Sequence, residues 1–456
     1  MTRIHRTRGI SDTFGATVWD KATSDVLNRG VLIVPFLWFK DPLDVAQVRQ
    51  QLLQKLLPIM RFRSKIVPVK DMLSTATAFQ ELDQATLEAA LPELVTAVDD
   101  VKNRADLDSF VSAMYNQPWE PELPLWRAYV INNFDDGRSL LVMNINHTIG
   151  DGVALLDVLD AIIDGDADGN PISPKKSVSR MPVPASCMEG CVMQMKGLWR
   201  AFYGPFIKDQ LPGDPRNKLK SKDGRRPGKA KAVFSTSPVP LQEVKAIKNQ
   251  LPGATINDIL MTLTDLTLRE YFLRYEPAAL RQQVRANMPI SMRREDDHDV
   301  YNPELFGNRF SQGHLYFPLH IEDPLEVMRQ MKAQIDVIKI SPEPIVRDKI
   351  VKFITTQSCF PPSLTAKLLL DAFGKVTVML SNVVGPTGEV QFLGQTLDDM
   401  TFFAMAPLGL YFGIVQYKGE IKVGICVDAA VEAEPKRLGE CWEEAYRKLK
   451  AAVLNR

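Results

Sequence analysis

The sequence is poor in cysteine, carries no excess charge of either sign and contains no long apolar run. Its five cysteines are an odd number scattered over 456 residues, which argues against a disulfide framework and favours a reducing compartment. Lysine and arginine together number 55, and so do aspartate and glutamate. Because no overall positive field would attract nucleic acid, we expect no nucleic-acid partner.

Targeting and metal-binding signals are also sparse. No stretch reaches the roughly 18 uninterrupted apolar residues of a membrane-spanning helix. The basic first ten residues lack the apolar region of a secretory signal, and they support a transit peptide only weakly. Cys187 and Cys191 are close in sequence, but no second pair or nearby histidine completes a zinc site. We therefore expect an intracellular protein without a bound metal.

The composition that is present belongs to a folded protein of more than one domain. Apolar residues make up 45% and charged residues 24% of a chain long enough for two or three domains. A run of glycine, aspartate, asparagine and proline at 164–171 interrupts all regular patterns. We predict an N-terminal domain over residues 1–170, a linker over 171–231 and a C-terminal domain over 232–456.

The linker contains two segments that each allow two interpretations. Apolar residues recur at helical spacing from Val183 to Ile207, which favours a helix packed on the protein's own core or one lying on a bilayer surface. From Lys208 to Lys231, nine basic residues accompany three acidic ones. Such a run is typical of a solvated linker, and the alternative is an anchor on anionic lipid headgroups.

Both large blocks mix strands with helices. Leu125–Phe134 and Arg138–Asn146 read as strands of a hairpin, and Asp151–Ile163 reads as the helix that follows. Thr255 is a suitable N-cap for a long helix, and the segments 410–417 and 421–427 predict a second hairpin. The pattern predicts two α/β layers with a cleft between them, and clefts between domains are favoured ligand sites.

The run Asn146-His147-Thr148-Ile149-Gly150-Asp151-Gly152 is the part of the sequence richest in chemistry. A largely apolar strand delivers His147 to its end, where rigid structure holds the side chain toward open space, as a general base requires. Asp151 falls in the first turn of the next helix, where its charge suits the helix dipole. As a bare pattern, HxxxD is common, and a lone histidine there is more often structural.

Other motifs narrow the interpretation. The sequence contains no GxSxG elbow, Walker loop, HExxH motif or dinucleotide fingerprint. Four elements accompany the histidine motif: Arg61-Phe62-Arg63, Pro124-Leu125-Trp126, Asn257-Asp258 and Ser381 to Pro386. In this order and spacing, over nearly the whole chain, the set resembles the wax ester synthase/diacylglycerol acyltransferase family.

The resemblance implies a fold and an activity. The fold is α/β (α+β), with two domains like chloramphenicol acetyltransferase and a cleft between them. The activity is transfer of a long-chain acyl group from acyl-CoA, the co-substrate, to a fatty alcohol or diacylglycerol, with no further cofactor. The family's motif is HHxxxDG, in which the second histidine aligns with His147 and Asn146 replaces the first. We expect activity to survive this replacement, which bears on acceptor preference or rate.

The resemblance also assigns roles to individual residues. It makes His147 the general base, Asp151 an anchor of the loop through an arginine such as Arg293, and Gly152 a spacer that keeps the cleft open. Asn257 is the first candidate for stabilising the oxyanion. The expected substrate-binding residues are Asn146, Asp258, Ser381 and Asn382.

Simpler interpretations stand beside several of these roles. Asn257 and Asp258 fit ordinary helix capping, Ser381-Asn382 fit a turn after a strand at 376–380, and Pro124 and Trp126 fit core packing. The runner-up functions are an acyltransferase acting on another alcohol or an amine, and a non-catalytic lipid-binding relative. The expected partners are acyl-CoA, a lipid acceptor and the surface of a membrane, such as the endoplasmic reticulum, or of a lipid droplet.

Overall fold

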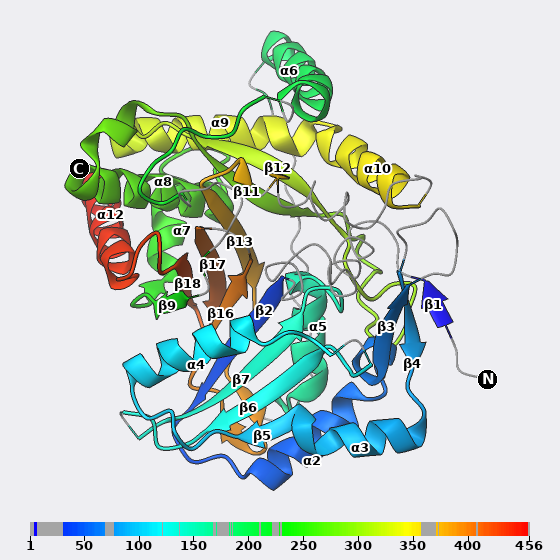
Figure 1. The fold of residues 1–456 in the computed structure, drawn as a ribbon. Helices are drawn as coiled ribbons and strands as arrows, with labels where there is room; N and C mark the ends of the chain where they lie inside the picture. The colour runs from blue at the N-terminus through cyan, green and yellow to red at the C-terminus, as the bar shows by residue number, and fades with distance from the viewer. Residues whose placement is uncertain are drawn as a thin grey trace.

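The computed structural model describes most of the chain as two lobes (Figure 1). The described residues are 4–6, 31–68, 77–120, 122–135, 137–166, 170, 182, 184, 186–208, 211–220, 228, 230–356, 371–372, 374–406 and 409–454. The blue and cyan segments of the N-terminal half form most of the lower lobe, which residues 399–405 of the C-terminal half join, and the other green to red segments form the upper lobe. Part of the basic run at 208–231, namely residues 209–210, 221–227 and 229, lies outside the described residues.

The N-terminal lobe is built on a five-stranded sheet of order β16-β2-β7-β6-β5. Its strands are β2 (Leu32–Phe39), β5 (Val95–Ala97), β6 (Trp126–Ile131), β7 (Ser139–Asn146) and β16 (Asp399–Met405). Its helices are α2 (Val45–Leu56), α3 (Gln84–Leu94), α4 (Arg104–Asn116) and α5 (Gly152–Ile162). The edge strand β16 comes from the C-terminal half of the sequence and pairs antiparallel with β2. The N-terminal sheet is therefore completed by residues far beyond the linker.

The C-terminal lobe is built on a seven-stranded sheet of order β10-β18-β17-β13-β11-β12, with β9 also paired to β18. Its strands are β9 (Lys231–Ser235), β10 (Val239–Pro240), β11 (Val284–Ser291), β12 (Phe310–Phe317), β13 (Val378–Val384), β17 (Leu410–Tyr417) and β18 (Glu420–Asp428). Its helices are α7 (Leu241–Asn249), α8 (Ile256–Tyr275), α9 (Pro324–Ile340), α10 (Glu343–Thr356) and α12 (Lys436–Leu454).

Smaller elements complete the molecule. One three-stranded sheet holds β1 (Ile4–Arg6), β4 (Thr77–Glu81) and β3 (Ser64–Pro68), and another holds β15 (Gln395–Thr396), β14 (Val390–Phe392) and β8 (Gly165–Asp166). The short 3-10 helices are η2 (Met60–Arg63) and η4 (Pro277–Arg281). The helix α6 (Cys187–Phe206) lies at the outer edge of the upper lobe (Figure 1). No helix among the described residues combines the length and the apolar character needed to cross a membrane.

The predicted elements around the histidine motif are confirmed. β6 and β7 pair antiparallel, as do β17 and β18. Asp151 caps α5, and Thr255 caps α8 through a capping box with Asp258. The expectation of a turn at Ser381-Asn382 is wrong, because β13 extends through Val384 and both residues lie within the strand. They pair in parallel register with Gly413 and Ile414 of β17.

Candidate active site

The loop between β7 and α5 is held rigidly from within. The Asn146 side chain is buried, and its Oδ1 accepts hydrogen bonds from the Thr148 backbone N–H at 2.9 Å and the Thr148 hydroxyl at 2.7 Å. The His147 backbone N–H donates to the Val31 carbonyl at 2.8 Å. The amide of Asn146 therefore shapes the turn that presents His147, and its Oδ1 is engaged in the two hydrogen bonds with Thr148.

The His147 ring is positioned by the C-terminal lobe. Its Nδ1 lies 2.9 Å from Oδ1 of Asn308, and Nδ2 of Asn308 donates to the His147 carbonyl at 2.7 Å. A carbonyl oxygen can only accept, so the bond to it fixes the orientation of the Asn308 amide and makes Nδ1 the protonated ring nitrogen. The remaining nitrogen, Nε2, then carries the lone pair that a base needs.

The surroundings of His147 favour the neutral ring. Burial lowers the pKa of the imidazole below its usual value, and this outweighs the opposing effects of the Asp151 charge and the hydrogen bond with Asn308. The ring also packs against Phe310 of β12, with 5.7 Å between the ring centres. A histidine in this state is ready to accept a proton near neutral pH.

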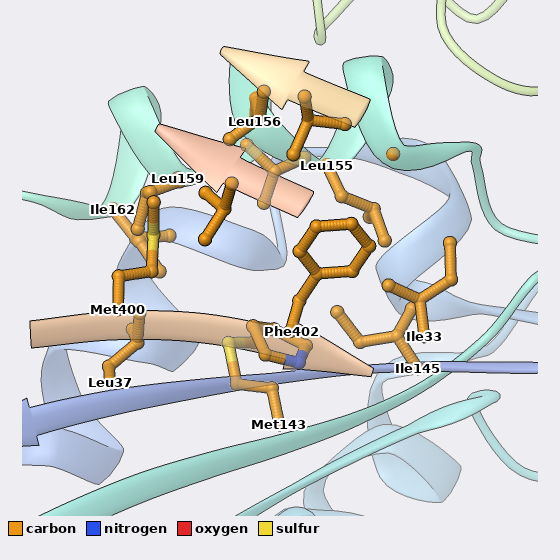
Figure 2. Close-up of a pocket in the computed structure, with 15 residues that line it drawn as sticks. Ile33, Leu37, Met143, Ile145, Leu155, Leu156, Leu159, Ile162, Met400 and Phe402 are labelled. Atoms are coloured by element: carbon orange, nitrogen blue, oxygen red, sulfur yellow. The ribbon is translucent and has the colours of Figure 1, made fainter. Parts of the chain in front are cut away.

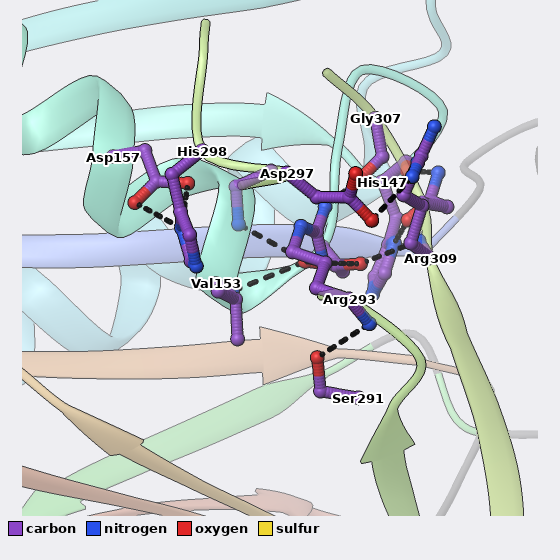
Figure 3. A network of polar contacts seen from close by, with 12 residues as sticks. His147, Val153, Asp157, Ser291, Arg293, Asp297, His298, Gly307 and Arg309 are labelled. Atoms are coloured by element: carbon purple, nitrogen blue, oxygen red, sulfur yellow. Dashed lines mark hydrogen bonds and ion pairs between the residues drawn. The ribbon is translucent and has the colours of Figure 1, made fainter. Parts of the chain in front are cut away.

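Asp151 holds the loop and does not face an open space. Both of its carboxylate oxygens lie 2.7 Å from Nη1 of Arg293, and Oδ2 also accepts the Arg309 backbone N–H at 2.8 Å (Figure 3). Its Oδ1 caps α5 through the N–H groups of Val153 and Ala154 at 3.1 and 3.0 Å. The predicted pairing with Arg293 is thus confirmed, and its two side chains are almost fully buried.

The segment that carries Arg293 and Asn308 makes further contacts with α5. His298 lies 3.0 Å from a carboxylate oxygen of Asp157, and Arg309 pairs with Asp297 at 2.6 Å (Figure 3). Arg293 also donates to the carbonyl of Gly307. The contact of His298 with Asp157 ties the loop between β11 and β12 to α5, and the two arginine contacts brace the loop itself, so both lobes hold the histidine motif.

A second set of polar side chains comes from α8 and β13. Nδ2 of Asn382 donates to Oδ1 of Asn257 at 3.2 Å, which joins the start of α8 to the strand. The next residue, Val383, approaches the histidine loop: a Cβ added to Gly152 would lie 3.2 Å from its Cγ1. Gly152 therefore permits the close approach of α5 to β13, as a spacer should. Through these contacts α8 and α5 both approach the end of β13, Asn257 at Asn382 and Gly152 at Val383, from opposite faces of the strand.

The remaining predicted residues have structural partners. Asp258 is fully buried, and Oδ2 accepts the Thr255 N–H at 2.6 Å as part of the capping box. The Ser381 hydroxyl forms a hydrogen bond with the hydroxyl of Tyr411 on the neighbouring strand. Trp126 is buried and donates from Nε1 to the Phe62 carbonyl at 2.8 Å, which confirms the core-packing interpretation for this residue.

An apolar cavity of about 60 Å³ lies between α5 and the N-terminal sheet (Figure 2), and Gly152 is one of its lining residues. Its walls come from α5, β2, β7 and β16 of that lobe, with Val383 and Val415 from the C-terminal sheet. No charged or hydrogen-bonding side chain lines it; the lining residues are Ile33, Pro35, Leu37, Met143, Ile145, Gly152, Leu155, Leu156, Val158, Leu159, Ile162, Val383, Met400, Phe402 and Val415. The histidine loop thus adjoins a space suited to hydrocarbon.

Asn308 and Arg61 support the histidine loop, and the sequence alone does not indicate this role for either. Asn308 lies in the run Phe306-Gly307-Asn308-Arg309-Phe310, directly before β12. Gly307 has φ of +136°, and a side chain there would clash with the Arg61 guanidinium. That guanidinium donates to the carbonyls of Thr148 and Ile149 at 3.2 and 3.1 Å. For Asn308, the sequence offers only a Gly-Asn pair just before a strand, and such a pair by itself indicates a turn.

Within the part of the chain that the structure describes, no group of three histidine, cysteine, aspartate or glutamate side chains could hold a metal ion.

Comparisons with known proteins agree with this geometry. The family profile "Wax ester synthase/diacylglycerol acyltransferase catalytic domain" matches residues 39–200, and the profile "WS/DGAT C-terminal domain" matches residues 306–450. Wax ester synthase/diacylglycerol acyltransferase 5 of Arabidopsis thaliana is 24% identical over 399 residues, covering 77% of this chain and 76% of its own.

Solved structures share the fold at low sequence identity. The wax ester synthase/diacylglycerol acyltransferase from Marinobacter aquaeolei VT8 superimposes with a TM-score of 0.61 at 16% identity, covering 98% of this chain and 99% of its own. The starter condensation domain of rhizomide synthetase RzmA, solved in complex with C8-CoA and Leu-SNAC, gives 0.57 at 11% identity and covers 99% and 94%. The chain has the two-lobed α/β architecture of these enzymes, and it is an acyltransferase that belongs to the wax ester synthase/diacylglycerol acyltransferase family.

Proposed function

We propose that this acyltransferase moves a long-chain acyl group from acyl-CoA to the hydroxyl group of a fatty alcohol, a diacylglycerol or both, giving wax esters and triacylglycerol. The observation that carries the proposal is the setting of His147. Its Nδ1 is bonded to Asn308, its pKa is lowered by burial, and Gly152 of the same motif lines an apolar cavity. A neutral base in a motif that also lines a hydrocarbon-like space suits an alcohol with a long chain.

The proposed reaction is direct transfer between the two substrates. Nε2 of His147 takes the proton of the acceptor hydroxyl as the oxygen attacks the thioester carbonyl carbon, and a tetrahedral intermediate forms. The carbon–sulfur bond then breaks, and the leaving thiolate of CoA takes the proton from the imidazolium. The products are an ester, free CoA and neutral His147, so no acyl-enzyme is required.

Asn257 is the proposed donor to the oxyanion of the intermediate. Its Oδ1 accepts from Asn382, and this fixes the orientation of its Nδ2 donor group at the start of α8. A preorganised donor of this kind is worth about 10²–10³ in rate. In this assignment Asn382 positions Asn257, and Ser381 supports the strand through Tyr411.

The apolar cavity is the proposed site of one hydrocarbon chain. Each methylene group that it buries contributes about 0.8 kcal/mol to binding, so a chain longer by eight carbons gains roughly 6 kcal/mol if all of it is enclosed. Its volume of about 60 Å³ is several times the roughly 10–15 Å³ that one water occupies on the same measure. The cavity therefore has room for part of a hydrocarbon chain.

Incubation of the purified protein with radiolabelled palmitoyl-CoA and either hexadecanol or dioleoylglycerol tests the proposal. Ester should form with at least one acceptor, and His147→Ala should abolish its formation while the circular dichroism spectrum is retained. His320→Ala is the matched control, because His320 is exposed in the loop after β12. Absence of ester from both acceptors would refute the substrate assignment, and full turnover by His147→Ala would refute the base.

Other acceptors form the second candidate function. The similarity to a condensation domain favours a test of amines as well as alcohols, since that domain was solved with C8-CoA and Leu-SNAC. Profiling hexadecanol, dioleoylglycerol, a short secondary alcohol and hexadecylamine under identical conditions separates the two. A clear preference for the amine or the short alcohol would replace the lipid-ester assignment.

A further inference from the structure

The helix α6 turns its large apolar side chains toward solvent. Trp199 is 60% exposed and Phe202 56% exposed, and both belong to a stripe at helical spacing. The other members of the stripe are Met188, Val192, Met195, Leu198 and Phe206. The helix packs on α9 and α10, but the interpretation that its large apolar residues belong to the protein's own core is wrong.

The inner face of α6 is made of small residues. Gly197, Ala201 and Gly204 face the protein and are buried. A Cβ on Gly204 would lie 2.7 Å from Oε1 of Glu343, and the Gly197 carbonyl accepts the Ser341 hydroxyl at 2.8 Å. Close packing of small residues and polar contacts thus hold the helix in place, while its large exposed apolar side chains lie mainly outside that contact.

The exposed apolar surface extends beyond α6. Ile207 and Leu211 follow the helix, and Ile345 and Phe353 lie on α10, which packs against α6. Within the described residues, all but three of the exposed large apolar side chains belong to α6, the residues just after it, or α10. An apolar concentration of this kind marks an interaction surface.

Positive charge accompanies this surface. A cavity of about 330 Å³ next to α6 is lined by Lys196, Arg200, Lys208 and Arg347, with Glu343 as its acidic residue. Glu343 pairs with both arginines, which leaves the lysines as excess charge. In the sequence, residues 209–231 contain eight more basic residues and three acidic ones, and Lys231 among them is buried against Asp428.

We propose that the outward face of α6, continued by Ile345 and Phe353 of α10, docks on an anionic phospholipid surface. The apolar stripe enters the boundary between headgroups and acyl chains, and the neighbouring lysines contact the headgroups. Charge complementarity selects this occupant, since a second copy of the chain would bring the same positive charge to the contact. The lipid acceptors give this docking its purpose, so the inference rests on the function proposed above.

Sedimentation with vesicles tests the docking surface without any substrate. The full-length protein is mixed with vesicles of equimolar phosphatidylcholine and phosphatidylserine, and with vesicles of phosphatidylcholine only. The double variant Trp199→Gln/Phe202→Gln removes apolar area without changing charge. Its matched control is Leu273→Gln/Tyr301→Gln, which replaces two exposed apolar residues away from α6 and α10.

We expect wild type and the control to bind the anionic vesicles alike, and the α6 variant to bind them about tenfold more weakly or worse. Activity on octanoyl-CoA and butanol, both water-soluble, should be equal in all three and shows that the variants are folded. Equal vesicle binding by the α6 variant, or no binding by wild type, would overturn the proposal. Either result leaves acyl transfer itself untouched, so the two proposals fail separately.

Two further measurements sharpen the outcome. Brominated phosphatidylcholine should quench part of the tryptophan fluorescence of wild type, and Trp199→Phe, which keeps the apolar area, should bind vesicles normally but lose that quenching. Light scattering tests the competing occupant. A wild-type dimer that becomes monomeric in the α6 variant while vesicle binding is unchanged would assign the face to a second copy and refute lipid docking.

Discussion

Replacing Asn308 by aspartate should move the pH dependence of catalysis. In the wild type, Asn308 accepts a hydrogen bond from Nδ1 of His147 at 2.9 Å, and burial keeps the pKa of the ring below its usual value of about 6.5. In the proposed mechanism activity requires the neutral ring, so activity should be present above this pKa and lost as the pH falls through it. Asn308→Asp retains an acceptor at the same place and adds a negative charge in direct contact with the ring.

The size of the shift follows from the distance. An opposite charge within about 4–6 Å of a titratable group shifts its pKa by about 1–3 units toward the charged form. The acidic limb of kcat/KM should therefore move up by about 1–3 pH units in Asn308→Asp. The variant also loses the amide that donates to the His147 carbonyl at 2.7 Å, so its rate at high pH should remain below that of the wild type.

Asn308→Ala separates these two effects. It loses the same amide donor but adds no charge, and it leaves the buried Nδ1–H without its acceptor, at a cost of about 1–3 kcal/mol. At about 1.4 kcal/mol for each factor of ten, its kcat should fall roughly five- to 150-fold at every pH, with no upward shift of the acidic limb.

Initial rates of ester formation from palmitoyl-CoA and hexadecanol between pH 5 and 9, at about half-unit steps, measure both variants against wild type. The reasoning is refuted if Asn308→Asp leaves the acidic limb in place, or if Asn308→Ala retains the wild-type kcat. A parallel shift of the limb in both variants would show that altered burial, and not the introduced charge, moves the pKa.

Three further changes have expected outcomes. Asp151→Asn leaves Arg293 as a buried cation without its counter-charge and should reduce the free energy of unfolding by about 3–5 kcal/mol, which urea titration measures; a loss below 1 kcal/mol would contradict a structural role. Asn257→Ala should lower kcat by about 10²–10³ with little change in KM, and a change confined to KM would remove its assignment to the oxyanion. Leu159→Trp fills the apolar cavity and should shift the preference from palmitoyl or hexadecanol chains to shorter ones, measured as ratios of kcat/KM; an unchanged ratio would place both chains elsewhere.

Much of the site could be predicted because its signals are local in the sequence. The alternation and turn residues before Asn146 predict the hairpin, and Asp151 and Thr255 are ordinary N-caps, so both helices begin where expected. The motif residues taken together indicate the family correctly. The ion pair between Asp151 and Arg293 joins residues 142 positions apart, and the family resemblance makes that pairing predictable.

Asn308 and the exposure of α6 could not be predicted from local pattern. An asparagine after glycine indicates a turn, and only the folded chain brings it to His147, 161 residues away. The apolar stripe of α6 has the same period whether it faces a core or solvent. What decides its direction is the opposite stripe of Gly197, Ala201 and Gly204, because small residues there allow closer packing than the large ones would.

The strand β16 has a consequence for synthesis of the protein. Residues 399–405 form the edge of the sheet that carries His147, and they leave the ribosome only after almost nine-tenths of the chain has been made. Until then β2 keeps one unpaired edge, and the wall that Met400 and Phe402 supply to the apolar cavity is missing. A nascent chain therefore cannot assemble a working site. Residues 1–230 expressed alone should be cleaved rapidly in β2 by a protease and become protected when residues 231–456 are co-expressed.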